Sequence, residues 1–230
     1  MSRTLAFALV LVALCVQQTA TVHAQACVAD QQGELVCGEG KAAMRVVCGT
    51  TSPSKQYAFA WRSEGLPSGR DLPPQGVENL LIRVADGAVL AKLGGAYWAT
   101  GEIRANRHDL LAAWSPDSQG VIEVANSRWE SDSFAYYRID GAAATRLDLR
   151  ALVEPVMTAR LPPRNRQGNS FRVREDLPVT FDARGRLRFT AMLYVPKSAT
   201  SNDYAVQVNV RTRGGKPSAE VVSLRQVKSN

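Results

Sequence analysis

Apolar and polar side chains alternate with a period of two along several stretches of the chain. Tyr57, Phe59 and Trp61 are separated by single alanines, and the run 204–210 has tyrosine or valine at every second position. The run 187–195 repeats this pattern. A period of two is typical of β-strands, because successive side chains point to opposite faces of a sheet. These runs are therefore predicted to be strands.

Short turn signals lie between the alternating runs, at Asp86-Gly87, Asp140-Gly141, Arg184-Gly185 and Gly214-Gly215. Such dipeptides suit the tight loops of β-hairpins, so neighbouring strands are expected to pair antiparallel. Only the segment 147–160 has apolar residues at helical spacing, and Pro155 is expected to bend or end that helix. The sequence predicts an all-β, mainly antiparallel fold: a β-sandwich or stacked sheets with at most one short helix near 147–160.

Residues 1–26 have the pattern of a secretory signal. A basic residue comes first, an apolar run follows, and the segment ends on small residues. No later run reaches the about 18 apolar residues of a transmembrane helix. We therefore expect export to the periplasm or the extracellular space. The remaining residues 27–230 are expected to form one β-rich domain, with the proline-containing loop 161–169 as the candidate for an inner boundary.

Three cysteines follow the predicted signal: Cys27, Cys37 and Cys48. Disulfides are expected in an exported chain, and Cys27 and Cys37 flank a Gln-Gln-Gly turn that would bring two short strands face to face. A disulfide between Cys27 and Cys37 is therefore favoured. One alternative pairs Cys37 with Cys48. Another is a lipoprotein in which Cys27 is acylated and the other two cysteines pair.

Positive charge is concentrated in the last third of the chain. Residues 27–155 hold 13 Lys and Arg against 16 Asp and Glu, whereas residues 156–230 hold 14 against 5. Many of the arginines lie two positions apart in predicted strands, so that they share a face. If those strands are neighbours, the arginines cover one side of a sheet. The predicted binding residues are Arg164, Arg166, Arg172, Arg174, Arg184, Arg186, Arg188, Arg211 and Arg213.

An arginine-covered face attracts polyanions such as lipid headgroups, lipopolysaccharide phosphates or an acidic protein. Arginine is also an ordinary choice for the solvent side of an antiparallel sheet. Nucleic acid is not expected, because the aromatic residues of this region alternate with the arginines and point into the core, away from any base. The sequence therefore predicts an exported, non-enzymatic binding module of the cell envelope.

The stretch Trp114-Ser-Pro-Asp-Ser is similar to the blade turn of TolB-type and dipeptidyl-peptidase-type β-propellers, and Thr51-Ser-Pro-Ser-Lys is a looser copy. This resemblance implies an alternative function, a propeller-like docking scaffold with the Pro53 and Pro116 turns at equivalent places in consecutive blades. A complete ring is not expected, because a ring needs at least about four blades. As a whole, the chain resembles small exported proteins of Gram-negative bacteria, which implies a location but no activity.

Candidate catalytic chemistry centres on His108, the only histidine after residue 26. A further alternative is an envelope hydrolase that uses His108 with a carboxylate, such as Asp109 or Asp117, and a serine such as Ser115. No nucleophile elbow, Walker loop or dinucleotide fingerprint is present, so neither catalytic residues nor a cofactor are predicted.

Metal binding is not predicted either. The mature chain has too few histidines and unpaired cysteines for a zinc site. A calcium site would require Glu130, Asp132 and Asp117 to converge, and the sequence has no calcium-loop motif to bring them together.

Overall fold

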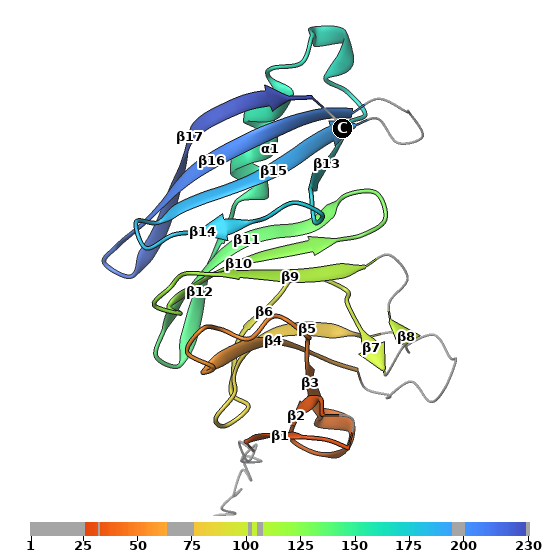
Figure 1. Cartoon of the computed structure of the whole chain (residues 1–230), viewed down its shortest axis with the longest axis vertical. Helices are drawn as coiled ribbons and strands as arrows, with labels where there is room; N and C mark the ends of the chain where they lie inside the picture. Colours follow the sequence, from red (N-terminus) through yellow and green to blue (C-terminus); the bar gives the residue numbers. More distant parts are fainter. Residues whose placement is uncertain are drawn as a thin grey trace, which may run out of the picture.

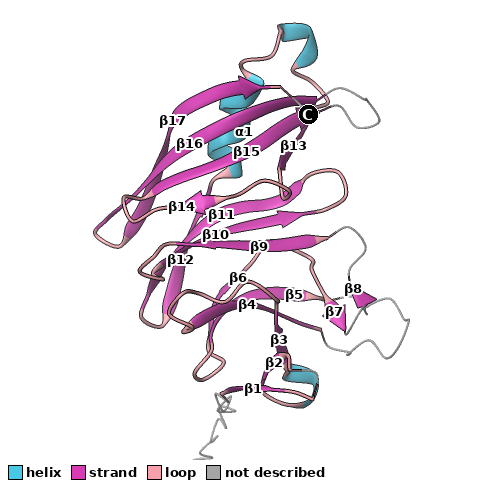
Figure 2. Ribbon diagram, viewed as in Figure 1, coloured by secondary structure: helices cyan, strands magenta, loops and turns pink. Residues whose placement is uncertain are grey.

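The structure, a computed structural model, describes residues 26–31, 33–63, 76–100, 103–104, 108–194 and 201–228. Three antiparallel sheets are stacked along the long axis of the molecule (Figure 1). Strands dominate, and the helices of the described residues are one α-helix and two short 3-10 turns (Figure 2). This confirms the predicted all-β class, in the form of stacked sheets. The predicted signal lies outside the described residues except for Ala26.

The N-terminal sheet is a meander of six strands with buried residues on both faces. In its fourth strand, Tyr57, Phe59 and Trp61 pack toward the middle sheet, while Ala58 and Ala60 belong to a separate cluster on the opposite face. The elements of this sheet are β1 (Cys27–Ala29), β2 (Leu35–Cys37), the 3-10 turn η1 (Gly40–Ala42), β3 (Met44–Val46), β4 (Tyr57–Arg62), β5 (Glu78–Arg83) and β6 (Val89–Lys92).

The first two strands carry the disulfide. Cys27 and Cys37 lie directly opposite each other in the β1–β2 pairing and are bonded. Cys48 is an exposed free thiol. The predicted pair is therefore confirmed, and the two alternatives that join Cys37 to Cys48 are wrong, because the hairpin pairs Cys37 with Cys27.

The middle sheet has a core on each side. Every residue of its strand β10 is buried. Val121 and Ala125 pack against the N-terminal sheet, and Ile122 and Val124 pack against the C-terminal sheet. The strands of this sheet are β9 (Asp109–Trp114), β10 (Gly120–Asn126), β11 (Ser131–Asp140) and β12 (Ala143–Asp148), and a small hairpin of β7 (Ala99–Thr100) and β8 (Ile103–Arg104) precedes them.

The C-terminal sheet packs on the middle sheet through one face only. Strands β13 and β14 pair with the two ends of β15, and β16 and β17 follow in order. Leu187, Phe189, Val206 and Val208 point toward the middle sheet and form the shared core. Its strands are β13 (Ser170–Val173), β14 (Thr180–Phe181), β15 (Arg186–Tyr194), β16 (Ser201–Arg213) and β17 (Lys216–Val227).

A single helix, α1 (Arg150–Thr158), connects the middle and C-terminal sheets. It runs through Pro155, so this proline, which was expected to bend or end the helix, does not end it. The proline removes only its own donor to the preceding turn, and the buried Val153 and Met157 anchor the helix on either side of it. The loop 161–169, with the 3-10 turn η2 (Pro163–Asn165), then leads into β13. No described helix is long and apolar enough to cross a membrane.

The two Ser-Pro turns have the same local structure. The first lies between β3 and β4 of the N-terminal sheet, and the second lies between β9 and β10 of the middle sheet. The backbone N–H of Ser52 donates to the carbonyl of Tyr57 at 2.8 Å, and that of Ser115 donates to the carbonyl of Gly120 at 2.8 Å. The Ser-Pro motifs thus build one repeated turn in consecutive sheets.

Candidate functional site

The predicted arginine surface lies on the outer face of the C-terminal sheet. Cross-strand pairing aligns Arg188 with Gln207, Arg186 with Asn209, and Arg213 with Lys216. Residues between these positions point into the core, so the arginines of β13, β15 and β16 share the opposite side. The structure therefore brings together six predicted residues: Arg172, Arg174, Arg186, Arg188, Arg211 and Arg213.

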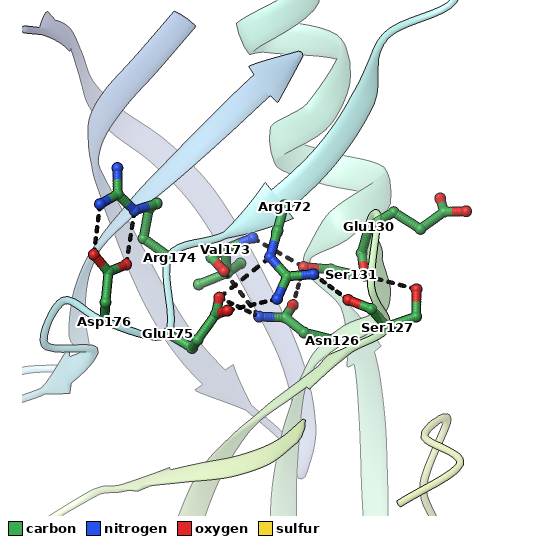
Figure 3. Close-up of polar contacts among 9 residues, drawn as sticks. All are labelled: Asn126, Ser127, Glu130, Ser131, Arg172, Val173, Arg174, Glu175 and Asp176. Atoms are coloured by element: carbon green, nitrogen blue, oxygen red, sulfur yellow. Dashed lines mark hydrogen bonds and ion pairs between the residues drawn. The ribbon is translucent and has the colours of Figure 1, made fainter. Parts of the chain in front are cut away.

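Two of these arginines are held tightly by carboxylates (Figure 3). The Arg172 guanidinium donates to Glu175 at 2.5 Å and also to the Ser127 carbonyl, and its side chain is only 9% exposed. Arg174 donates to Asp176 at 2.5 Å. It also donates to Asp203 at 2.6 Å. Hydrogen bonding to Asp176 raises the pKa of Arg174, and the same bond lowers the pKa of Asp176. Their charges are already compensated within the protein.

The contacts around Arg172 fasten the middle sheet to the C-terminal sheet. Asn126, at the end of β10, donates to the Val173 carbonyl at 2.9 Å and to Glu175 at 3.0 Å. The Ser131 hydroxyl donates to Asn126 at 2.6 Å and accepts from the Val173 N–H at 2.9 Å (Figure 3). Buried polar groups of this kind stabilise a fold when all their partners are present. Arg172 therefore holds these two sheets together, and its predicted role in a binding surface stays a prediction.

Two further predicted residues are also engaged within the fold. Arg186 pairs with Asp182 at 2.8 Å. Hydrogen bonds from the backbone N–H and the side chain of Arg186 lower the pKa of Asp182. Arg166 donates to the carbonyls of Leu161 and Ala159 at 3.0 and 3.1 Å, near the end of α1. Arg164 is exposed on η2, away from the strands of the sheet.

The remaining cations of the outer face are exposed and have almost no internal partners. Arg188 is 49% exposed and lies 4.0 Å from Asp182. The side chains of the other cations form no hydrogen bond or ion pair with a described residue; these are Arg211, Arg213, Lys216 and Arg225. We call these five residues the basic face: Arg188, Arg211, Arg213, Lys216 and Arg225.

Lys216 and Arg225 were missed by the sequence prediction. The two-residue turn at Gly214 and Gly215 places Lys216 opposite Arg213, which the sequence alone could have shown. Arg225 could not be placed in the same way. A β-bulge around Val222 shifts the register of β17 by one residue, and this shift turns Arg225 outward.

A shallow groove of 300 Å³ crosses the basic face between Arg188 and Arg225. The small side chains of Ala205 and Ser223 lie between the two arginines, and Gln207 adds an amide. Within the described part of the chain, no carboxylate lines this groove. The groove thus offers two guanidinium groups and neutral hydrogen-bonding groups to a small anion.

Of the residues named for a hydrolase, Ser115 and Asp117 do not lie beside His108. Its Nδ1 lies 3.7 Å from Asp132, which is neither of the predicted acids, and is buried without a hydrogen bond among the described residues. Ser115 lies beyond the far end of β9, about 20 Å along the strand. The Ser115 hydroxyl bonds instead to Asp117 at 2.5 Å and to its own turn.

The proposed calcium ligands do not converge either. Glu130 pairs with Arg150 at 2.9 Å beside the start of β11, whereas Asp117 lies in the turn at the other end of that sheet. The described part of the chain has no cluster of three or more His, Cys, Asp or Glu side chains placed to hold a metal ion.

No family model and no curated protein matches the chain. The likeness of the Ser-Pro turns to propeller blades, and that of the whole chain to exported Gram-negative proteins, stay predictions.

Proposed function

We propose that this protein is an exported, non-enzymatic binding module of the cell envelope, and that its basic face binds the phosphate groups of an anionic surface. The observation that carries this proposal is the groove between Arg188 and Arg225, which is lined by two exposed guanidinium groups and by no carboxylate of the described residues. Two neighbouring guanidinium groups are well suited to phosphate, because together they can donate several hydrogen bonds to its oxygens.

The charge balance of the sheet supports this proposal. Of the five carboxylates in residues 156–230, four pair with Arg172, Arg174 or Arg186. Only Glu220 remains among the cations of the outer face, opposite Asn209. These ion pairs therefore neutralise four of the five carboxylates, and the basic face keeps a net positive charge.

The shape and place of the face also fit a flat, extended partner. Strands β15, β16 and β17 carry it, and no described element forms a further layer beyond it (Figure 1). A planar anionic surface can contact several of these cations together, and each contributes about 1 kcal/mol to binding at such a surface. Export rests on the predicted signal. The disulfide between Cys27 and Cys37 supports it, because disulfides persist mainly in oxidising compartments.

The test is binding of the mature protein to phosphatidylglycerol vesicles, phosphatidylcholine vesicles and lipopolysaccharide at low and raised salt. We expect binding to the anionic surfaces only, and weaker binding at raised salt because of screening. The variant Arg188→Gln/Arg225→Gln should bind about 10- to 30-fold more weakly, from about 2 kcal/mol lost.

The matched control is Arg128→Gln/Arg160→Gln, which removes the same charge from exposed sites outside the C-terminal sheet. It should bind within about threefold of the wild type if electrostatics is local. Binding to neutral vesicles, or equal losses in both variants, would contradict the proposal. Binding to poly-glutamate but to no vesicle or lipopolysaccharide would identify an acidic protein as the partner and also contradict it.

A further inference from the structure

The repeated Ser-Pro turn makes a closed contact between the N-terminal and middle sheets. The Ser54 N–H donates to the Ser118 hydroxyl at 3.1 Å, so the two turns touch. The Trp114 indole N–H donates to the Thr50 carbonyl at 2.8 Å, and its ring stacks on Tyr57 with 6.3 Å between centroids. Trp114 and Tyr57 thus fill the space between the ends of these two sheets.

The corresponding place between the middle and C-terminal sheets is open. There, Phe181 precedes its turn as Trp114 does in the middle sheet. Gly120 begins the strand that follows a Ser-Pro turn, as Tyr57 begins β4 in the N-terminal sheet. Both residues are smaller than their counterparts. A pocket of 530 Å³ lies between these two turns, within the range of about 300–1,000 Å³ that small-molecule sites occupy.

An aromatic pair forms one wall of this pocket. Phe181 meets the ring of Tyr136 edge-on, with 5.6 Å between centroids. Tyr136 occupies the space that the missing side chain of Gly120 leaves, because a Cβ atom there would come within 2.8 Å of the tyrosine ring. The absence of a side chain at Gly120 therefore makes room for the Tyr136 ring in the pocket wall.

Charged side chains line the same pocket and retain unused hydrogen-bonding capacity. One oxygen of Asp117 accepts from Ser115 and from the Gln119 N–H, but the other lies 4.0 Å from the Arg138 guanidinium, which is too long for a hydrogen bond. The side chain of Arg184 has no hydrogen bond or ion pair with any described residue. One acceptor and two guanidinium donors thus remain for a ligand.

We propose that this pocket, which we call the turn pocket, binds a neutral saccharide. A sugar hydroxyl fits the gap between Asp117 and Arg138, because it can donate to the carboxylate and accept from the guanidinium. Further hydroxyls can accept from Arg184, and the C–H groups of the sugar ring can pack on Phe181. The lining carries charges of both signs, with Asp117 near Arg138 and with Asp182, which also pairs with Arg186, beside Arg184. The free Asp117 oxygen disfavours an anion and the two guanidinium groups disfavour a cation, so a ligand without net charge fits best.

The turn pocket is independent of the basic face, because the two share no residue. The test is isothermal titration of the mature protein with maltose, cellobiose, lactose and chitobiose. At least one of them should bind with a Kd of about 1 mM or tighter. Arg184→Ala should weaken that binding about 5- to 10-fold, since it removes a hydrogen bond to a charged group without disturbing any internal contact.

A second variant blocks the pocket. Ala183 is exposed on the turn that lines it, and Ala183→Trp should abolish saccharide binding by filling the space. The matched control is Ala151→Trp, which adds the same side chain to an exposed position of α1 and should bind as the wild type does. Thermal unfolding of both variants verifies that they fold. Failure of all four disaccharides to bind, or binding that survives Ala183→Trp, would overturn the proposal.

Discussion

Replacing Arg172 with alanine is expected to destabilise the fold. The substitution removes two hydrogen bonds to Glu175 and one to the Ser127 carbonyl. Breaking a fully buried ion pair costs about 3–5 kcal/mol, but the Glu175 side chain is 33% exposed and water can replace part of what it loses. We therefore expect a loss of about 2–3 kcal/mol in the free energy of unfolding.

This loss should be measured by thermal and urea unfolding, with tryptophan fluorescence as the signal. For a chain of this size it corresponds to a fall of about 5–10 °C in Tm. The matched control is Arg211→Ala, because Arg211 is an exposed arginine of the same sheet and should change stability by no more than about 0.5 kcal/mol. If the two variants have the same Tm, the contacts in Figure 3 do not stabilise the junction between the sheets as argued.

Three further predictions concern stability. Burial raises the pKa of Glu123 above its usual value near 4.5, so the folded protein keeps a proton that the unfolded chain has lost. The free energy of unfolding should therefore fall as the pH rises from about 4.5 through the folded-state pKa of Glu123. Urea unfolding midpoints measured against pH should show this fall in the wild type and lose it in Glu123→Gln. The same pH dependence in both proteins would refute the prediction. Gly120→Ala places a Cβ atom 2.8 Å from the Tyr136 ring and should cost about 1–3 kcal/mol, so an unaltered Tm would argue against the packing described. Reduction of the disulfide between Cys27 and Cys37, which are 10 residues apart, should cost about 2–3 kcal/mol of stability by the chain-entropy argument, and a Tm insensitive to reductant would contradict this.

The alternation of apolar and polar side chains along the chain predicted most of the fold. The inward positions Tyr204, Val206, Val208 and Val210 are all buried, as their period of two predicts. The order of strands within each sheet follows from hairpin turns such as the one at Asp140 and Gly141, because short turns join adjacent antiparallel strands. The sequence did not predict that β10 is buried on both faces, since that depends on the stacking of distant sheets.

The candidate site was harder to predict, because the face of a strand can be read from a sequence but ion pairing across the fold cannot. Arg172 and Arg188 both alternate with core residues, yet the first is buried against Glu175 and the second is exposed. The carboxylate of Asp203 reaches Arg174 from 29 positions away, and only the three-dimensional structure brings them together. Local periodicity therefore located the basic sheet face but could not separate structural arginines from unpaired ones.

The most direct test of the basic face compares two variants of the mature protein that lose the same charge. One replaces Arg188, Arg211, Arg213 and Arg225 with glutamine, and the other replaces Arg62, Arg83, Arg128 and Arg160. The measurement is affinity for phosphatidylglycerol vesicles at low salt. The account predicts a loss of more than about 100-fold in the first variant, from about 1 kcal/mol per cation, and little change in the second. Equal losses in both would show that only net charge matters and would contradict a binding surface on the C-terminal sheet.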